Sequence, residues 1–252
     1  MDEVTRGESG AAVYRSSDGT WYLKRVPAGQ EASLRAERDR VEWLGAQGVP
    51  CPRVLDWREG PEGAELTTSA VAGVPADRVP AATLLASWAA IADAVRRLHE
   101  LPPQTCPFTR DLTTMYALAL DVVARGAVNP EFLPDEQQAT PPAALLARLT
   151  PQLDARLAQE AAQTVVCHGD LCLPNILLDP ESATVTGFID LGRLGRADPY
   201  ADIALLLANS RETWAGEDAA READDAFAAR YGTPLDHDRA RFYLGLDPLT
   251  WG

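Results

Sequence analysis

The spacing of apolar residues along the chain changes after residue 73. The segment before residue 73 contains most of the expected strands, such as the one at residues 20–24, and one helix expected over residues 30–47. After residue 73 apolar residues recur every three or four positions over longer segments, which is typical of helices. These helices are expected at residues 81–100, 112–125, 143–162, 202–214 and 217–231, with His237 in a polar loop. The pattern predicts an α+β protein with a small sheet-rich N-lobe (residues 1–73) and a larger, mainly helical C-lobe (residues 74–252).

Three short apolar runs interrupt the helical half and predict strands. They lie at residues 164–167, 176–178 and 185–189. Turn-forming residues 179–182 join the last two runs into a hairpin. Such a hairpin brings Asn175 and Asp190, which flank its two strands, to the same end. Asp170 lies in the loop before the hairpin, so the pattern places three polar side chains at strand ends.

The polar residues in this region have the spacing of a kinase. Residues 168–175 read His-Gly-Asp-Leu-Cys-Leu-Pro-Asn, and Asp190 follows fifteen residues after Asn175. A kinase needs one carboxylate to accept or orient the acceptor's proton, and oxygen ligands for the Mg²⁺ that bridges the nucleotide phosphates. Asp170 fits the first role, and Asn175 and Asp190 fit the second. The alternative is two polar turns beside strands. Asp202 is expected to cap its helix or to brace the catalytic loop.

Lysine is almost absent from this chain. Of 23 basic residues only Lys24 is a lysine, and it lies in a predicted strand. A compact ammonium fits between phosphate oxygens and a carboxylate where a planar guanidinium does not. Glu37 lies on the apolar stripe of the helix over residues 30–47, and a carboxylate on an inward face needs a partner. We expect a nucleotide-binding Lys24–Glu37 pair; pairing of Glu37 with Arg38 or Arg40 is the alternative.

Residues 7–10 (Gly-Glu-Ser-Gly) form a candidate phosphate-covering loop between two strands. The loop has fewer glycines than other kinases use there. Ser9 is placed to offer a hydroxyl or a backbone N–H to a phosphate, although a plain β-turn would have the same sequence.

Charge and composition limit the partners. The formal net charge of −14 disfavours nucleic acid. The longest apolar run, residues 203–208, is too short to span a membrane, and the first residues do not resemble a signal peptide. Four scattered cysteines favour a reduced, cytoplasmic protein. Residues 198–238 carry ten acids against three arginines, an excess that suits a cationic substrate, although the acids of residues 218–225 are expected to form a solvated face.

Several segments resemble the aminoglycoside O-phosphotransferases, antibiotic-resistance kinases with a protein-kinase-like fold. The resemblance in the catalytic region lies in residues 168–175, 187–193 and 197–202. Residues 129–136 and 242–252 are similar to the streptomycin 3''-phosphotransferase branch of the family. The resemblance covers nearly the whole chain, from Gly7 to Gly252.

The resemblance implies a protein-kinase-like two-lobed fold and an enzyme that uses ATP and Mg²⁺. We expect the enzyme to be a monomer. It implies an aminoglycoside acceptor, with the 3''-hydroxyl of streptomycin expected, and adenine binding by the backbone of Ser69, Ala70 and Val71. Glu212 and Asp247 are expected to contact this cationic substrate. One alternative is a kinase of another acceptor, such as a different aminoglycoside, a macrolide, choline or a sugar. Another is a non-catalytic nucleotide-binding module, although all the kinase residues are present.

Overall fold

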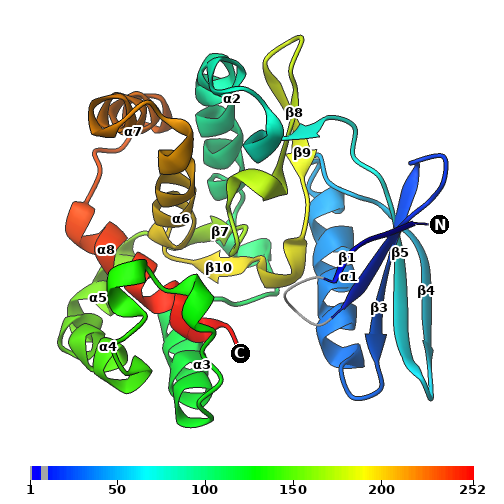
Figure 1. Cartoon of the computed structure of the whole chain (residues 1–252), viewed down its shortest axis with the longest axis horizontal. Helices are drawn as coiled ribbons and strands as arrows, with labels where there is room; N and C mark the ends of the chain where they lie inside the picture. The colour runs from blue at the N-terminus through cyan, green and yellow to red at the C-terminus, as the bar shows by residue number, and fades with distance from the viewer. Residues whose placement is uncertain (1, 7–10) are drawn as a thin grey trace. The chain divides into compact units, whose positions relative to one another are not determined.

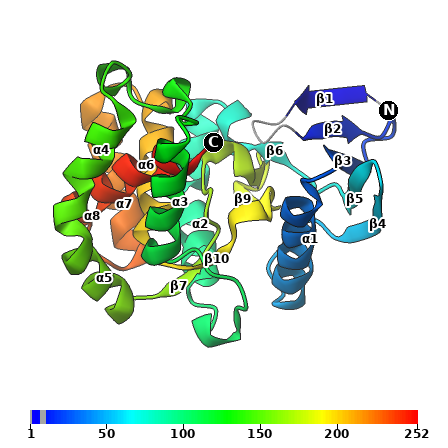
Figure 2. The ribbon, with the colours of Figure 1, turned by 90° about the horizontal axis from the view of Figure 1, so that it is seen from below.

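The computed structural model describes residues 2–6 and 11–252, which form two compact units (Figures 1 and 2). Unit 1 consists of Met1–Ile91 and Pro174–Arg193, and unit 2 of Ala92–Leu173 and Leu194–Gly252. Each unit is therefore built from two separate stretches of the chain. The predicted α+β class, with strands concentrated near the N-terminus and helices after them, is confirmed.

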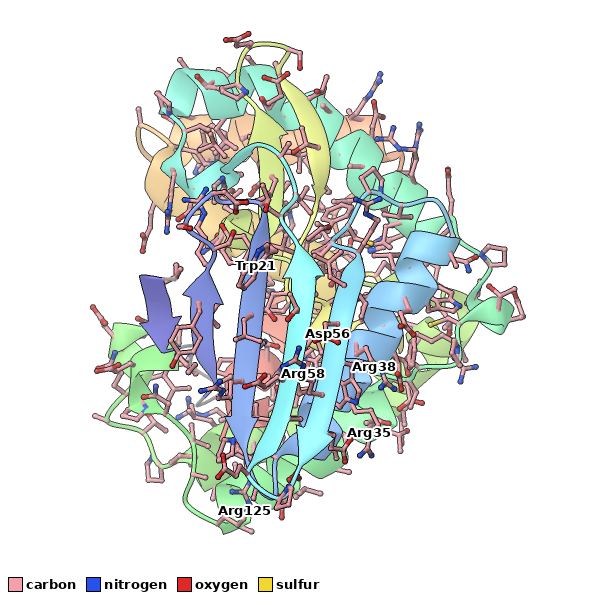
Figure 3. The ribbon with its side chains drawn as sticks, turned by 90° about the vertical axis from the view of Figure 1, so that its right-hand side faces the viewer. Trp21, Arg35, Arg38, Asp56, Arg58 and Arg125 are labelled. Carbon is pink, nitrogen blue, oxygen red and sulfur yellow. The ribbon has the colours of Figure 1, made fainter. Side chains whose placement is uncertain are left out.

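An antiparallel sheet with the strand order β1-β2-β3-β5-β4 dominates unit 1 (Figure 3). Its strands are β1 (Asp2–Arg6), β2 (Ala12–Arg15), β3 (Trp21–Pro27), β4 (Val54–Gly60) and β5 (Gly63–Ser69). Gly63 opens β5 with a φ of +124°, and an added Cβ there would lie 2.0 Å from the carbonyl oxygen of Val26. The turn from β4 into β5 therefore requires glycine.

Helix α1 (Glu31–Ala46) packs against one face of this sheet (Figure 2). Its buried residues recur at helical spacing and are Leu34, Val41 and Leu44. The guanidinium carbon of Arg38 lies 4.8 Å from the centre of the Trp57 ring on β4. A cation over an aromatic face is favourable, so this contact adds to the aliphatic packing of α1. The helix expected over residues 30–47 is confirmed.

A second sheet in unit 1 has the strand order β6-β8-β9. Its strands are β6 (Val74–Pro75), β8 (Ile176–Asp179) and β9 (Thr184–Phe188). Any Cβ at Gly187 on β9 would lie 2.8 Å from the Pro50 carbonyl oxygen and 2.9 Å from Cγ1 of Val71, so glycine permits this close approach. Because β6 pairs with β8, unit 1 extends past residue 73. The division into a nucleotide-binding lobe (residues 1–73) and a catalytic, acceptor-binding lobe (residues 74–252) is a division by function and stays a prediction.

Unit 2 is mainly helical. Its two-stranded antiparallel sheet consists of β7 (Val165–Cys167) and β10 (Gly195–Ala197). Its α-helices are the end of α2 (Ala81–His99), α3 (Leu112–Ala124), α4 (Pro142–Leu149), α5 (Leu153–Ala162), α6 (Tyr200–Ser210), α7 (Glu217–Tyr231) and α8 (His237–Leu246). The 3₁₀ turns of the chain are η1 (Ala76–Arg78), η2 (Pro103–Thr105), η3 (Pro130–Phe132), η4 (Asp135–Gln137), η5 (Thr150–Gln152), η6 (Leu173–Asn175), η7 (Leu191–Arg193), η8 (Arg211–Thr213) and η9 (Asp247–Thr250). Within the described ranges, none of the helices has the length and apolarity needed to cross a membrane.

Two predictions for the helical half are wrong. The single helix expected over residues 143–162 is two helices, α4 and α5, separated by η5. Pro151 lies in η5, and its missing N–H and its ring interrupt an α-helix. His237 is the first residue of α8 and does not lie in a loop. Asp236 caps this helix, since its Oδ1 accepts a hydrogen bond from the N–H of Arg239 at 2.9 Å.

Candidate functional site

Lys24, Glu37 and Asp190 form a charged cluster in unit 1. The Nζ of Lys24 lies 2.7 Å from Oε2 of Glu37 and 3.4 Å from Oδ1 of Asp190. Strand β3 supplies Lys24, α1 supplies Glu37, and Asp190 follows β9. Arg38, one of the alternative partners of Glu37, pairs with Asp39 at 2.6 Å. The predicted ion pair of Lys24 with Glu37 is confirmed.

The ammonium of Lys24 stays charged in this cluster. Burial alone would lower the pKa of Lys24, but the carboxylates of Glu37 and Asp190 more than offset it and hold this pKa above its ordinary value. Both carboxylates therefore fix the position of the cation. Ser9, together with the rest of the expected phosphate-covering loop, lies outside the described residues.

Asn175 and Asp190 lie at the same end of the β8–β9 hairpin, as predicted. Ile176 is opposite Phe188 in the register, and the N–H of Ile189 donates to the carbonyl oxygen of Asn175 at 3.0 Å. Asp190 has a φ of +58°, the left-handed region that Asp adopts more readily than most residues. The two side chains offer carboxylate and amide oxygens, which are the ligands that Mg²⁺ prefers. The donor set therefore fits a magnesium ion.

Residues 69–71, at the end of β5 and just after it, use two of their three backbone N–H groups in hydrogen bonds within unit 1. The N–H of Ser69 donates to the Arg53 carbonyl oxygen, and that of Ala70 to the Thr20 carbonyl oxygen, both at 2.8 Å. Among the described residues, the N–H of Val71 has no hydrogen-bond partner. Of the three residues expected to bind adenine, Val71 thus keeps its donor available.

Asp170 lies in unit 2, in the loop that follows β7. Its N–H donates to Nδ1 of His168 at 3.3 Å, and its carbonyl oxygen accepts from the N–H of Cys172 at 3.0 Å. Gly169 has a φ of +84°, which glycine adopts without strain. The partly exposed Asp170 side chain therefore belongs to a tightly turned loop with internal hydrogen bonds.

Asp202, near the start of α6, braces this loop as expected. Its side chain is fully buried; Oδ2 accepts from the N–H of His168 at 2.6 Å, and Oδ1 accepts from the N–H of Gly169 at 2.8 Å. Nε2 of His99 lies 3.1 Å from Oδ2. Burial would raise the pKa of Asp202, but the hydrogen bonds from His99 and Gly169 keep it below its ordinary value. An ionised carboxylate therefore holds the backbone on the N-terminal side of Asp170.

His99, Cys167 and Asp202 also have the spacing of a metal site, since their ligand atoms lie within 4.8 Å of one another. These groups already have partners, however. Nδ1 of His99 lies 2.8 Å from the hydroxyl of Tyr231, and the thiol of Cys167 donates to the carbonyl oxygen of Asp198 at 3.3 Å. Burial raises the pKa of the Cys167 thiol, which disfavours the thiolate that a metal needs. The cluster is best explained as a hydrogen-bonded brace.

The two residues expected to contact substrate differ in their present partners. Asp247 opens η9, with Oδ1 3.2 Å from Nη2 of Arg110 and Oδ2 accepting from Nε1 of Trp251 at 3.1 Å. Glu212 lies exposed in η8, and within the described part of the chain its carboxylate forms no hydrogen bond or ion pair. Glu212 is therefore available to a cation, whereas a cation at Asp247 would share the carboxylate with Arg110.

Many acids of residues 198–238 serve the protein itself. Asp198 is fully buried and lies 2.6 Å from Nη2 of Arg239. On the surfaces of α7 and α8, Asp218 pairs with Arg221 and Asp238 pairs with an arginine one turn later. The acidic excess of this segment therefore does not by itself mark a substrate surface.

Nearly the whole chain matches one enzyme family. The profile described as the phosphotransferase enzyme family matches residues 2–243. The streptomycin 3''-kinase of Streptomyces griseus is 66% identical over 249 residues, which cover 99% of this chain and 92% of that protein. This chain belongs to the aminoglycoside phosphotransferase family.

Relatives of this phosphotransferase include solved structures. Aminoglycoside phosphotransferase APH(3'')-Id of Streptomyces rimosus, in complex with ADP and streptomycin, has a TM-score of 0.93 and 66% identity, covering 98% of this chain and 94% of that chain. The aminoglycoside 3'-phosphotransferase of Streptomyces fradiae is 40% identical, over 97% of this chain and 92% of that protein. These likenesses confirm the expected family and its fold.

The sequence analysis did not identify Asn209, which holds the loop that carries Asp170. Oδ1 of Asn209 accepts from the N–H of Leu173 at 2.8 Å, at the end of the segment that carries Asp170. Asn209 lies two turns after Asp202 on the same face of α6. Two polar residues at this spacing in a mostly apolar helix are the signal that would have found it. No comparable local signal marks Tyr231. Its hydroxyl contacts Nδ1 of His99, which lies 132 positions away in the sequence.

Proposed function

We propose that this phosphotransferase transfers the γ-phosphate of ATP to the 3''-hydroxyl of streptomycin and so inactivates the antibiotic. The observation that carries the proposal is the 66% identity, over 99% of this chain, to the streptomycin 3''-kinase of Streptomyces griseus. The similar Streptomyces rimosus enzyme has been solved with ADP and streptomycin bound. The 3'-phosphotransferase of Streptomyces fradiae is less similar, at 40% identity, which favours the 3''-position.

In this proposal the N-lobe of residues 1–73 binds the nucleotide, and residues 74–252 supply the catalytic and acceptor-binding groups. Lys24, held 2.7 Å from Glu37, donates to phosphate oxygens. Ser69 and Val71 bind the adenine through their backbone, and the available N–H of Val71 supports this role. Ser9 contacts a phosphate.

Asn175 and Asp190 are proposed to hold Mg²⁺. Their place at one end of the hairpin and their oxygen donors support this role. When bound, Mg²⁺ would neutralise negative charge on the phosphate oxygens. Asp190 also accepts from Lys24 at 3.4 Å, so the same carboxylate orients the cation.

Asp170 is proposed to accept the proton of the acceptor hydroxyl. The hydroxyl oxygen forms a bond to the γ-phosphorus while the bond from that phosphorus to ADP breaks, and the hydroxyl proton passes to Asp170. Asp202 supports this role because it fixes the backbone of His168 and Gly169. A base fixed in this way does not have to be ordered during the reaction.

Glu212 and Asp247 are proposed to bind the substrate's guanidinium groups. Streptomycin carries two guanidinium groups, and carboxylates bind such groups through paired hydrogen bonds. The exposed Glu212 carboxylate, without a partner within the described residues, supports this role. We further propose that the enzyme acts as a monomer and that it is cytoplasmic. The four cysteines, which form no disulfide among the residues the structure describes, are in keeping with a reducing compartment.

The proposal is tested by measuring ADP release from ATP with the purified chain and a panel of acceptors. The panel contains streptomycin, kanamycin, a macrolide and choline, and Asp170→Asn serves as the inactive control. We expect ADP release that depends on streptomycin and is lost in the variant. Turnover of kanamycin but not streptomycin would reject the acceptor and leave the kinase intact, whereas no ADP release with any acceptor would reject both.

A further inference from the structure

A series of hydrogen bonds in unit 2 connects the end of α7 to the loop that carries Asp170. The hydroxyl of Tyr231 lies 2.8 Å from Nδ1 of His99, and Nε2 of His99 lies 3.1 Å from Oδ2 of Asp202. The carboxylate of Asp202 accepts from the backbone N–H groups of the two residues immediately before Asp170. The Tyr231 hydroxyl is therefore connected, through one imidazole, to the carboxylate that holds the loop.

The ring of Tyr231 is held by two aromatic neighbours. Tyr231 is the last residue of α7, and its ring stacks on that of Phe227, one turn earlier, with ring centres 5.8 Å apart and an angle of 10° between the planes. The ring of His99 meets it nearly at a right angle, with centres 5.7 Å apart. Both neighbours are buried, and stacked and edge-to-face contacts favour a defined ring orientation. The hydroxyl is thereby held at Nδ1 of His99.

The direction of these hydrogen bonds follows from the ionised Asp202. A carboxylate accepts hydrogen bonds and does not donate them, so Nε2 of His99 carries a proton. In a neutral imidazole Nδ1 is then an acceptor that needs a donor. Burial raises the pKa of the Tyr231 hydroxyl, so this group keeps its proton and can supply that donor. Tyr231 thus favours the tautomer in which His99 donates to Asp202.

We propose that Tyr231 and His99 are positioning residues for the phosphotransfer reaction. Both act through Asp202, which holds the loop of the candidate base Asp170, so the inference rests on the proposed function. Without the Tyr231 hydroxyl, Nδ1 of His99 becomes a buried acceptor that lacks a donor, and the imidazole is no longer held in place. Asp202 then loses a partner that fixes its orientation, and the loop becomes less ordered where it carries the base.

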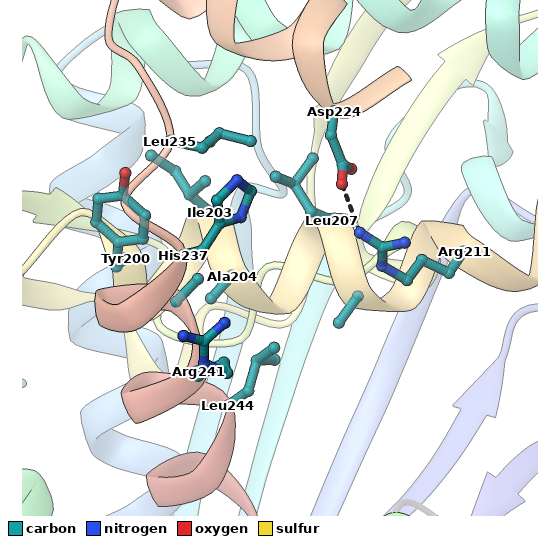
Figure 4. A pocket seen from close by; sticks show the side chains of 12 residues that line it. Tyr200, Ile203, Ala204, Leu207, Arg211, Asp224, Leu235, His237, Arg241 and Leu244 are labelled. Carbon is teal, nitrogen blue, oxygen red and sulfur yellow. Dashed lines mark hydrogen bonds and ion pairs between the residues drawn. The ribbon is translucent and has the colours of Figure 1, made fainter. Parts of the chain in front are cut away.

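Tyr200 provides a matched control in the same unit. It is buried and lines the pocket among α6, α7 and α8 (Figure 4). Its hydroxyl donates to the carbonyl oxygen of Pro234 at 3.3 Å and accepts from the N–H of Asp236 at 2.5 Å. These contacts hold the segment between α7 and α8. Tyr200→Phe therefore removes a hydrogen-bonded phenol hydroxyl from unit 2 and leaves the partners of Asp202 in place.

The first measurement is the steady-state kinetics of streptomycin-dependent ADP release by the full chain. Tyr231→Phe is expected to lower kcat about fivefold, the effect of one hydrogen bond, with KM for ATP and streptomycin unchanged. It should have no further effect in the His99→Leu background, because the hydroxyl acts through the imidazole. His99→Gln keeps a side-chain N–H donor and should recover part of the kcat that His99→Leu loses. Tyr200→Phe should lower Tm and leave kcat unchanged.

The second measurement is hydrogen exchange, which reports on the loop without requiring activity. Relative to the slowest amides of unit 2, the N–H groups of His168 and Gly169 should exchange about fivefold faster in Tyr231→Phe, and at the wild-type rate in Tyr200→Phe. Wild-type kcat or wild-type exchange in Tyr231→Phe would overturn the inference, as would an equal effect of this change with and without His99. No ADP release from wild type would instead reject the proposed function, and the exchange rates would then decide whether Tyr231 holds the loop.

Discussion

Replacing Asp202 by asparagine tests how the loop that carries Asp170 is held. The carboxylate accepts from the N–H groups of His168 and Gly169, and His99 adds a third hydrogen bond. The amide of asparagine has one accepting oxygen, and its NH₂ group would face a buried N–H that also donates. A buried group left unsatisfied costs about 1–3 kcal/mol, and the loss of charge weakens the bond that remains, so we expect a total of about 3 kcal/mol. In a domain of this size, that loss lowers Tm by roughly 6–12 °C.

The same substitution is expected to reduce turnover. Asp170 immediately follows Gly169, so a released Gly169 N–H moves the candidate base. A displacement of about 1 Å costs on the order of 10²-fold in kcat. KM for the nucleotide should change little, because Lys24 and Glu37 lie in unit 1.

The assay combines thermal melting with steady-state kinetics, and Asp225→Asn, at an exposed acid, is the control. Asp202→Asn should lower both Tm and kcat, while the control should change neither. A normal Tm would refute the buried hydrogen-bond argument. A lowered Tm with wild-type kcat would show that Asp202 stabilises the unit without positioning Asp170.

Four other predictions concern single residues. Lys24→Arg keeps the charge but is expected to lower kcat/KM for ATP by about 10²-fold, because a planar guanidinium cannot replace the ammonium held by Glu37; wild-type kinetics would show the lysine to be incidental. Asp170→Asn is expected to lower kcat by at least about 10²-fold while calorimetry shows normal ADP binding; an increase in KM alone would make Asp170 an acceptor-binding residue. Asp190→Asn should raise the Mg²⁺ concentration needed for half-maximal rate, and an unchanged Mg²⁺ titration would remove it from the metal ligands. Burial raises the pKa of Glu160 to about 7, so its protonated form favours the folded state at low pH and this contribution is lost as the pH rises from the ordinary value of 4.5 toward 7. Glu160→Gln should therefore show a smaller fall in Tm than wild type over that pH range, and equal slopes would contradict the assignment.

Much of the candidate site follows from local sequence patterns. Asn175 and Asp190 flank two strands joined by a short turn, so hairpin geometry alone brings them to one end. Glu37 falls on the apolar stripe of α1, and an inward carboxylate requires a cation such as Lys24. In both cases strand or helix periodicity determines where the side chain points.

Other parts depend on contacts between distant segments. Asp202 meets His99 across 103 positions, and Asp247 meets Arg110 across 137, so no local pattern specifies either pair. Helix α8 (His237–Leu246) buries Arg239 beside apolar residues, which no local pattern predicts, because the partner of Arg239 is the buried and distant Asp198. Net charge does not locate the substrate surface for the same reason. It cannot distinguish a buried acid with a partner from an exposed acid that is available to a substrate.

The position of the transferred phosphate tests the central claim most directly. The product of streptomycin and ATP would be purified, and phosphorus–proton and carbon NMR would identify the phosphorylated oxygen. The account predicts a single phosphate on the 3''-oxygen of the N-methylglucosamine ring. Phosphate on the 6-oxygen of the streptidine ring, or on any other oxygen, would contradict it.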